Sequence, residues 1–427
     1  MTRNQLRTLS NTGSKPFRGM IRILTYMVIL FLLVSACDSH QVPEKVSVRT
    51  GAEMLIENHL ADLAGKRVGL VMNPTARIGE VHVLDTLMAL NVNVTALFAP
   101  EHGFRGEAGA GEIIEDGVDQ ATELPVFSLY GETRSPTPEM LQQTDLLLFD
   151  MQDVGARFYT YNSTLGLVLK EAAKMDIPVW VLDRPNPAGG DYVSGWIMEE
   201  EFESFVGMYP IPIAHGMTLG ELARMMIGEK WLDADQSPQL RVIEMTGWNR
   251  TMKWPETGLE WIAPSPNLPT FEHAYAYLGT CLIEGTTLSE GRGTDDPFLT
   301  IGAPETNISD ENLKKVNRMP GLRATSTSFT PLSIPGKAMN PKHEGELCKG
   351  YKLEITDLNT YDPVKSGLQL IRNLMNQTDG SEIKPYLYKL TGTNKIDDFL
   401  NSDMDKTSFE FGLEEFIAKR QNYLIYN

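Results

Sequence analysis

The sequence RVGLVM at residues 67–72, followed by NPT at 73–75, sets a pattern that recurs along the first half of the chain. It is an apolar run of strand length that ends in polar and turn-forming residues. Continuous apolar runs of this length are typical of strands buried on both faces of a parallel sheet. Further runs of the same kind lie at 92–99, 125–129, 146–149 and 178–182.

Amphipathic segments separate these apolar runs. Residues 81–90 and 163–175 carry apolar side chains at three- and four-residue spacing, which predicts helices. Another helix is expected at 219–227, because Thr218 and Glu221 have the spacing of a capping box. Strands that alternate with helices predict an α/β fold with a Rossmann-like, doubly wound parallel sheet.

A second pattern begins at about residue 275, where the alternation weakens. A strand at 351–355 and amphipathic helices at 364–376 and 411–423 predict a smaller α+β domain. We therefore place a Rossmann-like α/β domain at 51–270 and an α+β C-terminal domain, which completes the cleft, at 271–427.

The N-terminus has the pattern of an export signal followed by a tether. Basic residues, and no acidic residue, precede the apolar run 23–34, which is too short to span a bilayer comfortably. The run ends in LVSAC at 33–37, which resembles a lipobox and predicts lipidation of Cys37. We expect a lipoprotein signal peptide at 1–36, a tether at 37–50, and a lipid-anchored protein of the cell envelope, either periplasmic or associated with the outer membrane. The alternative is an ordinary secretory signal or short membrane anchor with an incidental cysteine.

Composition and motif spacing exclude several classes of partner. The formal net charge of −18 disfavours nucleic acid, because like charges repel. No C-x-x-C or H-E-x-x-H spacing predicts zinc, and Asn73-Pro74-Thr75-Ala76 replaces the G-x-G-x-x-G that a dinucleotide would need. We expect no metal and no cofactor. Cys281 and Cys348 either pair or remain buried thiols, and the oligomeric state is left open.

Polar clusters follow the five apolar runs. In an open parallel sheet the carboxyl ends of the strands lie at one edge, and ligands bind there. These clusters are therefore expected to converge on one crevice. They lie at 73–75, 100–106, 130–132, 150–159 and 183–187.

Six loop motifs together resemble the exo-β-N-acetylmuramidase family, which was formerly a domain of unknown function. The resemblance covers about residues 50–427. It implies a Rossmann-like domain, a smaller C-terminal domain and an active site in the cleft between them. It also implies release of N-acetylmuramic acid from the non-reducing ends of peptidoglycan fragments. The motifs are PEHGFRG at 100–106, DVGARFYTY at 153–161, DRPNP at 183–187, HGMT at 215–218, PSPN at 264–267 and SEGRGT at 289–294.

Glycosidic cleavage generally needs a proton donor and a second carboxylate that acts as base, nucleophile or charge stabiliser. Glu101 is the expected donor, because it follows a strand and precedes a glycine turn, and the resemblance points to it as well. For the second carboxylate we select Asp153 and Glu290, and attack by the C2 acetamido group of the substrate is an alternative. The residues that qualify by local context are Asp150, Asp153, Asp183, Glu284 and Glu290.

The lactyl carboxylate of N-acetylmuramic acid favours recognition by an arginine fork. Among the arginines of the clusters, Arg157 and Arg292 are preferred over Arg105 and Arg184. Tyr159 is expected to stack on a sugar face. The other predicted substrate-binding residues are His102, Asp150, Asp183, Asn186, His215, Asn267 and Glu284.

The sequence therefore predicts an exo-acting glycosidase whose substrate is a peptidoglycan-derived sugar. One alternative is a non-catalytic envelope lipoprotein that binds muropeptides in the same cleft. Another is a metal-dependent hydrolase that uses Asp150, Asp153, His102 and His215 as ligands. The architecture alone does not choose among these functions, because it hosts many chemistries.

Overall fold

The computed structural model describes residues 47–105, 116–131, 133–402 and 408–427. The predicted signal peptide and the lipidation site Cys37 lie outside the described residues. Ser47–Asn427 forms one unit by its internal contacts. None of the described helices is long and apolar enough to cross a bilayer.

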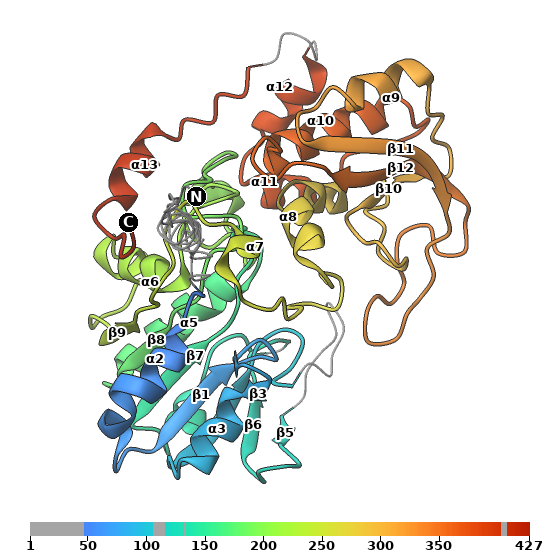
Figure 1. Cartoon of the computed structure of the whole chain (residues 1–427). Coiled ribbons are helices and arrows are strands. Elements are labelled where there is room, and N and C mark those ends of the chain that lie inside the picture. The colour runs from blue at the N-terminus through green and yellow to red at the C-terminus, as the bar shows by residue number, and fades with distance from the viewer. Residues whose placement is uncertain (1–46, 106–115, 132, 403–407) are drawn as a thin grey trace, which may run out of the picture. The chain divides into compact units, whose positions relative to one another are not determined.

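The strands form two main sheets and a short two-stranded one (Figure 1). Their bounds are β1 Val68–Met72, β2 Arg77–Ile78, β3 Val81–His82, β4 Val94–Ala99, β5 Gly117–Val118, β6 Pro125–Ser128, β7 Leu146–Asp150, β8 Val179–Leu182, β9 Leu240–Ile243, β10 Thr300–Ala303, β11 Leu322–Phe329 and β12 Cys348–Ile355.

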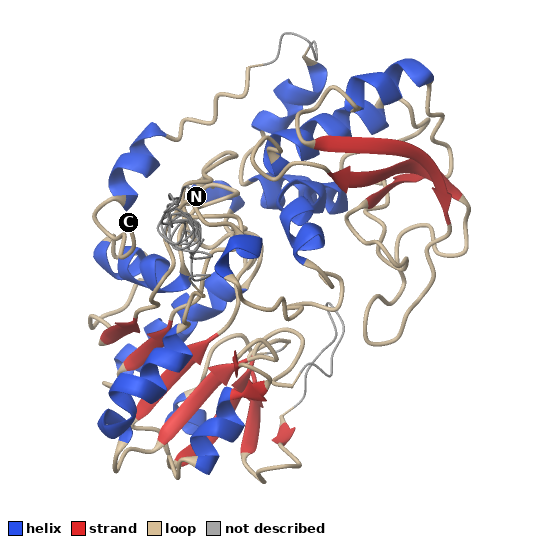
Figure 2. Ribbon diagram, viewed as in Figure 1, coloured by secondary structure: helices blue, strands red, loops and turns tan. Residues whose placement is uncertain are grey.

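Helices connect these strands and cover the sheets (Figure 2). The α-helices are α2 Gly51–Met54, α3 Val83–Ala89, α4 Pro138–Leu141, α5 Tyr161–Lys174, α6 Leu219–Gly228, α7 Trp254–Thr257, α8 Phe271–Thr280, α9 Asp310–Val316, α10 Pro363–Met375, α11 Tyr386–Thr391, α12 Lys395–Asn401 and α13 Glu414–Arg420. Shorter helical turns are η1 Leu55–His59, η2 Leu60–Leu63, η3 Glu200–Phe202 and η4 Cys281–Gly285.

The larger sheet has seven strands in the order β5-β6-β4-β1-β7-β8-β9. All neighbouring strands are parallel except the short edge strand β5, which runs antiparallel to β6. Every residue of β1, β7 and β8 is buried, which is why these strands appear in the sequence as unbroken apolar runs. The predicted doubly wound α/β fold is confirmed.

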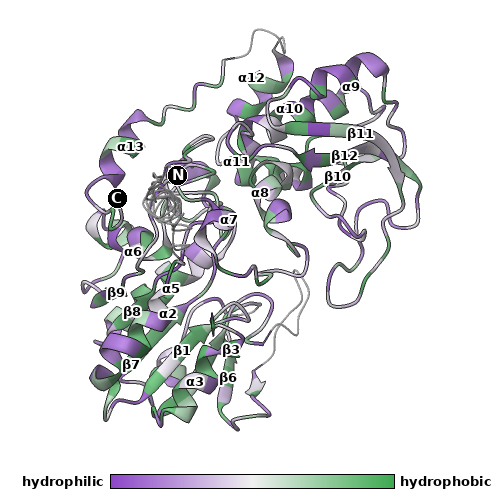
Figure 3. Cartoon of the chain, viewed as in Figure 1, coloured by the Kyte–Doolittle hydropathy of each residue, from purple (hydrophilic) through white to green (hydrophobic). Residues whose placement is uncertain are grey.

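Alternate residues of one strand pack into different layers. Leu70 of β1 belongs to the cluster that contains Leu84 of α3, whereas Val71 belongs to the cluster that contains Leu165 of α5. Helices therefore cover both faces of the sheet (Figure 2), and the hydrophobic colour of β1 in Figure 3 agrees with its burial on both sides.

The order of the strands creates a crevice at the carboxyl edge of the sheet. Strand β1 pairs with β4 on one side and with β7 on the other. The direction of winding reverses at this point, and the connections leave the two strands on opposite faces. A ligand site is therefore expected beyond the carboxyl ends of β1, β4 and β7.

Local sequence signals explain several helix boundaries. The predicted capping box is confirmed at α6, where the Glu221 backbone N–H donates to Thr218 Oγ1 at 3.2 Å and the Thr218 N–H donates to the Glu221 carboxylate at 3.0 Å. The helix expected at 81–90 starts only at Val83, because Val81–His82 forms the short strand β3. The last helix is shorter than the predicted 411–423 and covers Glu414–Arg420.

The C-terminal region has a three-stranded antiparallel sheet in the order β10-β12-β11. Helices α8 and α10 cross at Gly279 and Gly367, where a Cβ on Gly367 would lie 2.3 Å from the Gly279 carbonyl carbon. Only glycine permits this approach of the two backbones. Cys281 and Cys348 are buried free thiols, so the structure favours that alternative over a disulfide. The predicted boundary near residue 270 stays a prediction.

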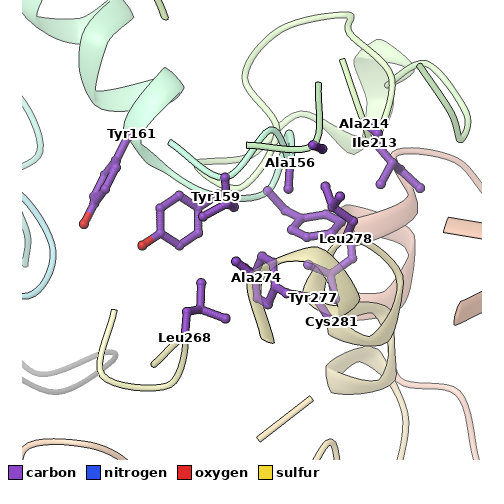
Figure 4. Close-up of a cluster of buried hydrophobic side chains, with 14 of the residues drawn as sticks. Ala156, Tyr159, Tyr161, Ile213, Ala214, Leu268, Ala274, Tyr277, Leu278 and Cys281 are labelled. Atoms are coloured by element: carbon purple, nitrogen blue, oxygen red, sulfur yellow. The ribbon is translucent and has the colours of Figure 1, made fainter. Parts of the chain in front are cut away.

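A shared core joins the two sequence regions. Residues of the loop after β7, including Ala156 and Tyr159, pack against Tyr277 and Leu278 of α8 (Figure 4). Arg157 lies in this loop and is completely buried. Its Nη1 donates to the carbonyls of Trp196 and Ile211, both at 2.8 Å, and its Nη2 donates to the carbonyl of Leu390 at 2.7 Å. This guanidinium therefore ties three distant segments together.

We expect Arg157→Met to lower the free energy of unfolding by about 3–5 kcal/mol, because three buried carbonyls lose their donors. Chemical denaturation monitored by circular dichroism measures the change. Lys170→Met is the matched control, since it removes a surface cation of α5 that pairs with the exposed Asp233, and it should cost less than about 1 kcal/mol. Equal stability of the two variants would contradict a structural role for Arg157.

Candidate active site

A cavity of about 320 Å³ opens beyond the carboxyl ends of β4, β6 and β7. Its floor comes from the loops that follow these strands, and the C-terminal region supplies the opposite wall. The lining residues are Glu101, His102, Tyr130, Arg134, Phe158, Tyr159, Thr160, Ser204, Phe205, Val206, Ser265, Leu268, Tyr277, Glu284, Arg292, Phe298, Tyr386 and Lys389.

Glu101 lies two residues beyond the end of β4, at the edge where the topology predicts a ligand. The backbone turns sharply after it, with φ of 76° at His102 and 83° at Gly103. Its carboxylate accepts a hydrogen bond from Thr160 Oγ1 at 3.4 Å. Burial and the charge of Glu101 raise the pKa of the Tyr130 hydroxyl, which also hydrogen-bonds to Glu101. Hydroxyl groups from the loops after β6 and β7 therefore contact the carboxylate of Glu101.

Glu284 brings a second carboxylate to the same cavity from the C-terminal region. Its Oε1 accepts a hydrogen bond from Arg292 Nε at 2.9 Å and forms an ion pair with Arg292 Nη2 at 2.8 Å. Burial raises the pKa of Glu284, and the positive charge of Arg292 partly opposes this shift. The ion pair offsets part of the effect of burial, and the pKa of Glu284 stays above its usual value.

Glu290 lies beside this pair but lines a neighbouring cavity. Its carboxylate pairs with Lys342 at 2.9 Å and lies 3.8 Å from Arg292. The predicted catalytic Glu290 is thus part of an ion-pair network behind Glu284. Glu284, which we assigned to substrate binding, is the carboxylate that shares the main cavity with Glu101.

An aromatic cluster lies at the cavity, which Tyr159 and Tyr277 line. The ring centroids of Tyr159 and Tyr161 are 4.8 Å apart, and Tyr159 lies 5.9 Å from Tyr277 (Figure 4). The Tyr161 hydroxyl donates to the Pro264 carbonyl at 2.9 Å and accepts from Asn73 Nδ2 at 2.7 Å. Tyr159 thus packs against Tyr161 and Tyr277 at the cavity, where it was predicted to contact the sugar.

Two aspartates that were predicted to bind substrate are buried and bind other groups of the protein. Asp150 is completely buried and forms a bidentate pair with Arg184. Asp183 accepts hydrogen bonds from Thr218 Oγ1, the Gly220 N–H and the Tyr426 hydroxyl, and burial raises its pKa to about 7. The structure contradicts the assignment of Asp150, Arg184 and Asp183 to substrate binding, because these side chains orient loops and do not line the cavity.

The predicted catalytic Asp153 also lies away from the cavity surface. Its Oδ2 accepts from the Gly155 N–H at 2.8 Å and is 3.4 Å from Nε2 of the fully buried His215. The positive φ of Gly155 shapes this turn. Asp153 therefore braces the loop that carries Tyr159, and neither Asp153 nor His215 lines the cavity.

Two predicted amides are likewise structural. Asn186 donates to the Met217 carbonyl at 3.1 Å and accepts from the Ala188 N–H at 3.0 Å. Asn267 is completely buried and donates to the Lys337 carbonyl at 2.7 Å. His102, in contrast, does line the cavity as predicted, although it is only 4% exposed.

The four predicted arginines are all occupied by internal partners. Arg105 pairs with Asp119 and Asp85 and lines another cavity, whereas Arg157 is bound to backbone carbonyls in the core. Arg184 binds Asp150, and Arg292 binds Glu284. The preference for Arg157 as the lactate ligand was wrong, because its guanidinium is inaccessible to a substrate.

Two exposed cations that the motif analysis missed line the cavity instead. Arg134 lies over the ring of Phe205, with 4.5 Å from its guanidinium carbon to the ring centroid. Lys389 lies on α11. Within the described part of the chain, neither cation forms an ion pair with a carboxylate. The missed signal was the position of Arg134, four residues after Tyr130 in the loop beyond β6.

The four metal ligands considered for a hydrolase do not all come together at one place. Asp150 is bound to Arg184 and Asp153 lies beside His215. Over the residues that the structure describes, no group of three or more histidine, cysteine, aspartate or glutamate side chains is arranged to hold a metal ion.

Comparison with known proteins assigns the chain to a family. Residues 68–272 match the N-terminal family model of the exo-β-N-acetylmuramidase NamZ, and residues 275–426 match its C-terminal model. The chain is 39% identical to the peptidoglycan β-N-acetylmuramidase NamZ of Bacillus subtilis (strain 168), with 96% of this chain and 99% of the relative covered.

Two crystal structures of DUF1343 family proteins from Bacteroides fragilis NCTC 9343 have the same architecture. One is 32% identical with a TM-score of 0.78, covering 90% of this chain and 100% of the other. The second is 33% identical with a TM-score of 0.73, covering 89% and 99%. The resemblance found in the loop motifs is thus confirmed, and the chain belongs to the exo-β-N-acetylmuramidase NamZ family.

Proposed function

We propose that this protein is an exo-acting β-N-acetylmuramidase, which releases N-acetylmuramic acid from the non-reducing ends of peptidoglycan fragments. The observation that carries the proposal is the pair of glutamates, Glu101 and Glu284, in one cavity that aromatic side chains and exposed cations also line. Two carboxyl groups at one site are what glycosidic hydrolysis generally requires. The family to which the chain belongs supports the same activity.

In this proposal Glu101 is the proton donor. The bond between C1 of the muramyl residue and the oxygen of the leaving sugar breaks, and that oxygen takes the proton of Glu101. A water molecule then bonds to C1 and returns a proton to Glu101, so that the enzyme is regenerated. The hydroxyls of Thr160 and Tyr130 beside Glu101 orient its carboxyl group towards the cavity.

Glu284 has a different role in the reaction. Arg292 holds the carboxyl group of Glu284 in an ion pair, and a glutamate in its ionised form can stabilise positive charge. Positive charge develops at C1 and the ring oxygen as the glycosidic bond breaks. We therefore assign Glu284 to stabilising this charge, and Arg292 to positioning Glu284.

Glu101→Gln should reduce kcat by about 10²- to 10⁴-fold with little change in KM, because an amide keeps the shape of the side chain but cannot supply the proton. Release of N-acetylmuramic acid from a β-linked muramide measures the loss. Glu415→Gln, at an exposed glutamate of α13, is the control and should retain wild-type activity. Full activity of Glu101→Gln would refute the assignment, and a wild type that binds muropeptides without cleaving them would favour the binding-protein alternative.

The exposed cations suit an acidic sugar. N-acetylmuramic acid differs from N-acetylglucosamine by a lactyl group, whose carboxylate needs a cationic partner when it enters a partly buried site. Arg134 is oriented by its contact with Phe205 and can present two parallel N–H donors. We therefore propose Arg134 as the main ligand of the lactyl carboxylate, with Lys389 as a second positive charge at the cavity.

The wild type should hydrolyse an aryl β-N-acetylmuramide about 10- to 100-fold faster, by kcat/KM, than the matching N-acetylglucosaminide, since the charged hydrogen bonds form only with the former. Arg134→Met should remove most of this preference by slowing the muramide alone. Arg318→Met, at another exposed arginine, should leave the ratio unchanged. Release of the aryl group gives both rates, and an unaltered preference in Arg134→Met would exclude this arginine.

The N-terminal sequence supports export and lipid anchoring. We propose that Cys37 carries a lipid and that the residues after it tether the folded chain to the membrane, so that the enzyme acts at the cell envelope near its substrate. The predicted tether 37–50 extends too far, because Val48 is buried and Thr50 caps helix α2. Wild-type protein should fractionate with membranes and incorporate labelled fatty acid, whereas Cys37→Ser should do neither. Fatty-acid labelling of Cys37→Ser would contradict this proposal.

A further inference from the structure

A second cavity of about 370 Å³ adjoins the main one. Four residues line both cavities and therefore form the boundary between them: Glu101, Glu284, Arg292 and Tyr386. The two carboxyl groups of the proposed mechanism thus lie at the junction of two separate spaces. A glycosidic bond that reacts at this junction would have one sugar on each side of it.

The far wall of the second cavity is a segment of the β11–β12 connection, residues 337–342. This segment is fixed along its length. Lys337 Nζ donates to the Thr294 carbonyl at 3.2 Å, and the Lys337 carbonyl accepts from Asn267 at 2.7 Å. The segment can therefore form a defined wall without a bound ligand.

Lys342 is committed to internal partners as well. Its Nζ donates to the carbonyls of Ile283 and Thr286, both at 3.0 Å, and of Leu288 at 2.6 Å, and it pairs with Glu290 at 2.9 Å. The lysines of this wall are therefore occupied, as is Arg292 by Glu284. The second cavity differs in this respect from the first, where Arg134 and Lys389 are not paired with carboxylates of the described chain.

Apart from the two proposed catalytic glutamates and Glu290, which is paired with Lys342, the lining groups that remain for a ligand are neutral. Met339 is 50% exposed and Tyr386 is 39% exposed, and both line the second cavity. Asn340, which is also exposed, adds an amide that can hydrogen-bond to hydroxyl groups. Apolar surface combined with a neutral amide fits an uncharged sugar better than an acidic one.

We infer that the second cavity is the subsite for the leaving sugar, and that it binds the uncharged N-acetylglucosamine residue on the reducing side of the bond that is cleaved. The main cavity then holds the N-acetylmuramic acid residue. The inference rests on the proposed function. It predicts that Met339 packs against the leaving sugar, a contact that plays no part in the proposed chemical steps.

The test compares two substrates of the full-length protein. The β-1,4-linked disaccharide of N-acetylmuramic acid and N-acetylglucosamine fills both cavities, whereas β-N-acetylmuramyl fluoride has a leaving group too small to occupy the second. Met339→Ala should lower kcat/KM for the disaccharide about three- to tenfold, as expected for partial loss of one apolar contact. Its kcat/KM for the fluoride, measured by fluoride release, should stay within about twofold of wild type.

Leu347→Ala is the matched control, because Leu347 is an apolar residue of the same connection that is 60% exposed and does not line the cavity. It should leave both rates unchanged, and thermal melting of both variants checks that the fold is intact. If Met339→Ala changes neither rate or lowers both equally, or if Leu347→Ala reproduces the selective loss, the inference is overturned while the proposed function stands. If the wild type hydrolyses neither substrate, the proposed function itself fails.

Discussion

The buried side chain of Arg157 joins the loop after β7 to the C-terminal region. Burial lowers the pKa of its guanidinium to about 9, so the group still carries its charge at neutral pH. A buried charge is costly unless hydrogen bonds satisfy it. Here the donors find carbonyls of Trp196, Ile211 and Leu390, which come from two regions of the sequence far apart. A Cβ on Gly392 would lie only 2.8 Å from Nη2, so the glycine leaves space for the guanidinium.

This contact has a direct consequence for the site. The loop that contains Arg157 also carries Tyr159 and Thr160, which line the cavity. Docking of the loop onto the C-terminal region thus places its own side chains and brings Glu284 opposite Glu101. The cavity is complete only when both regions have packed, because each contributes one of the two carboxyl groups. The packing that forms this shared core therefore also forms the site.

The sequence predicted the fold better than the site, for a physical reason. Strands such as β1 and β7 are buried on both faces, so their composition alone identifies them. The rule that ligands bind at strand carboxyl ends also located Glu101. The same rule could not separate Glu101 from Asp150 or Asp183, because that distinction depends on partners such as Arg184 and Tyr426, which are remote in the chain. The end of a strand can be recognised from the local sequence, whereas the partner of a charged side chain is set by the tertiary structure.

Charge pairing also explains why the arginines were the least predictable residues. Arg157 and Arg292 lie in motifs of the family, but an arginine in a motif can have a structural role and bind other parts of the protein. An arginine that binds a substrate must instead leave its donors unpaired in the folded chain, at an energetic cost that the protein tolerates only where solvent reaches the group. Arg134 meets this condition because it is exposed and is held by an aromatic ring rather than by a carboxylate. The difference between the two cavities follows from the same principle. In the second cavity the cations are paired inside the wall, which suits an uncharged sugar. In the main cavity the cations are exposed, which suits an acidic sugar.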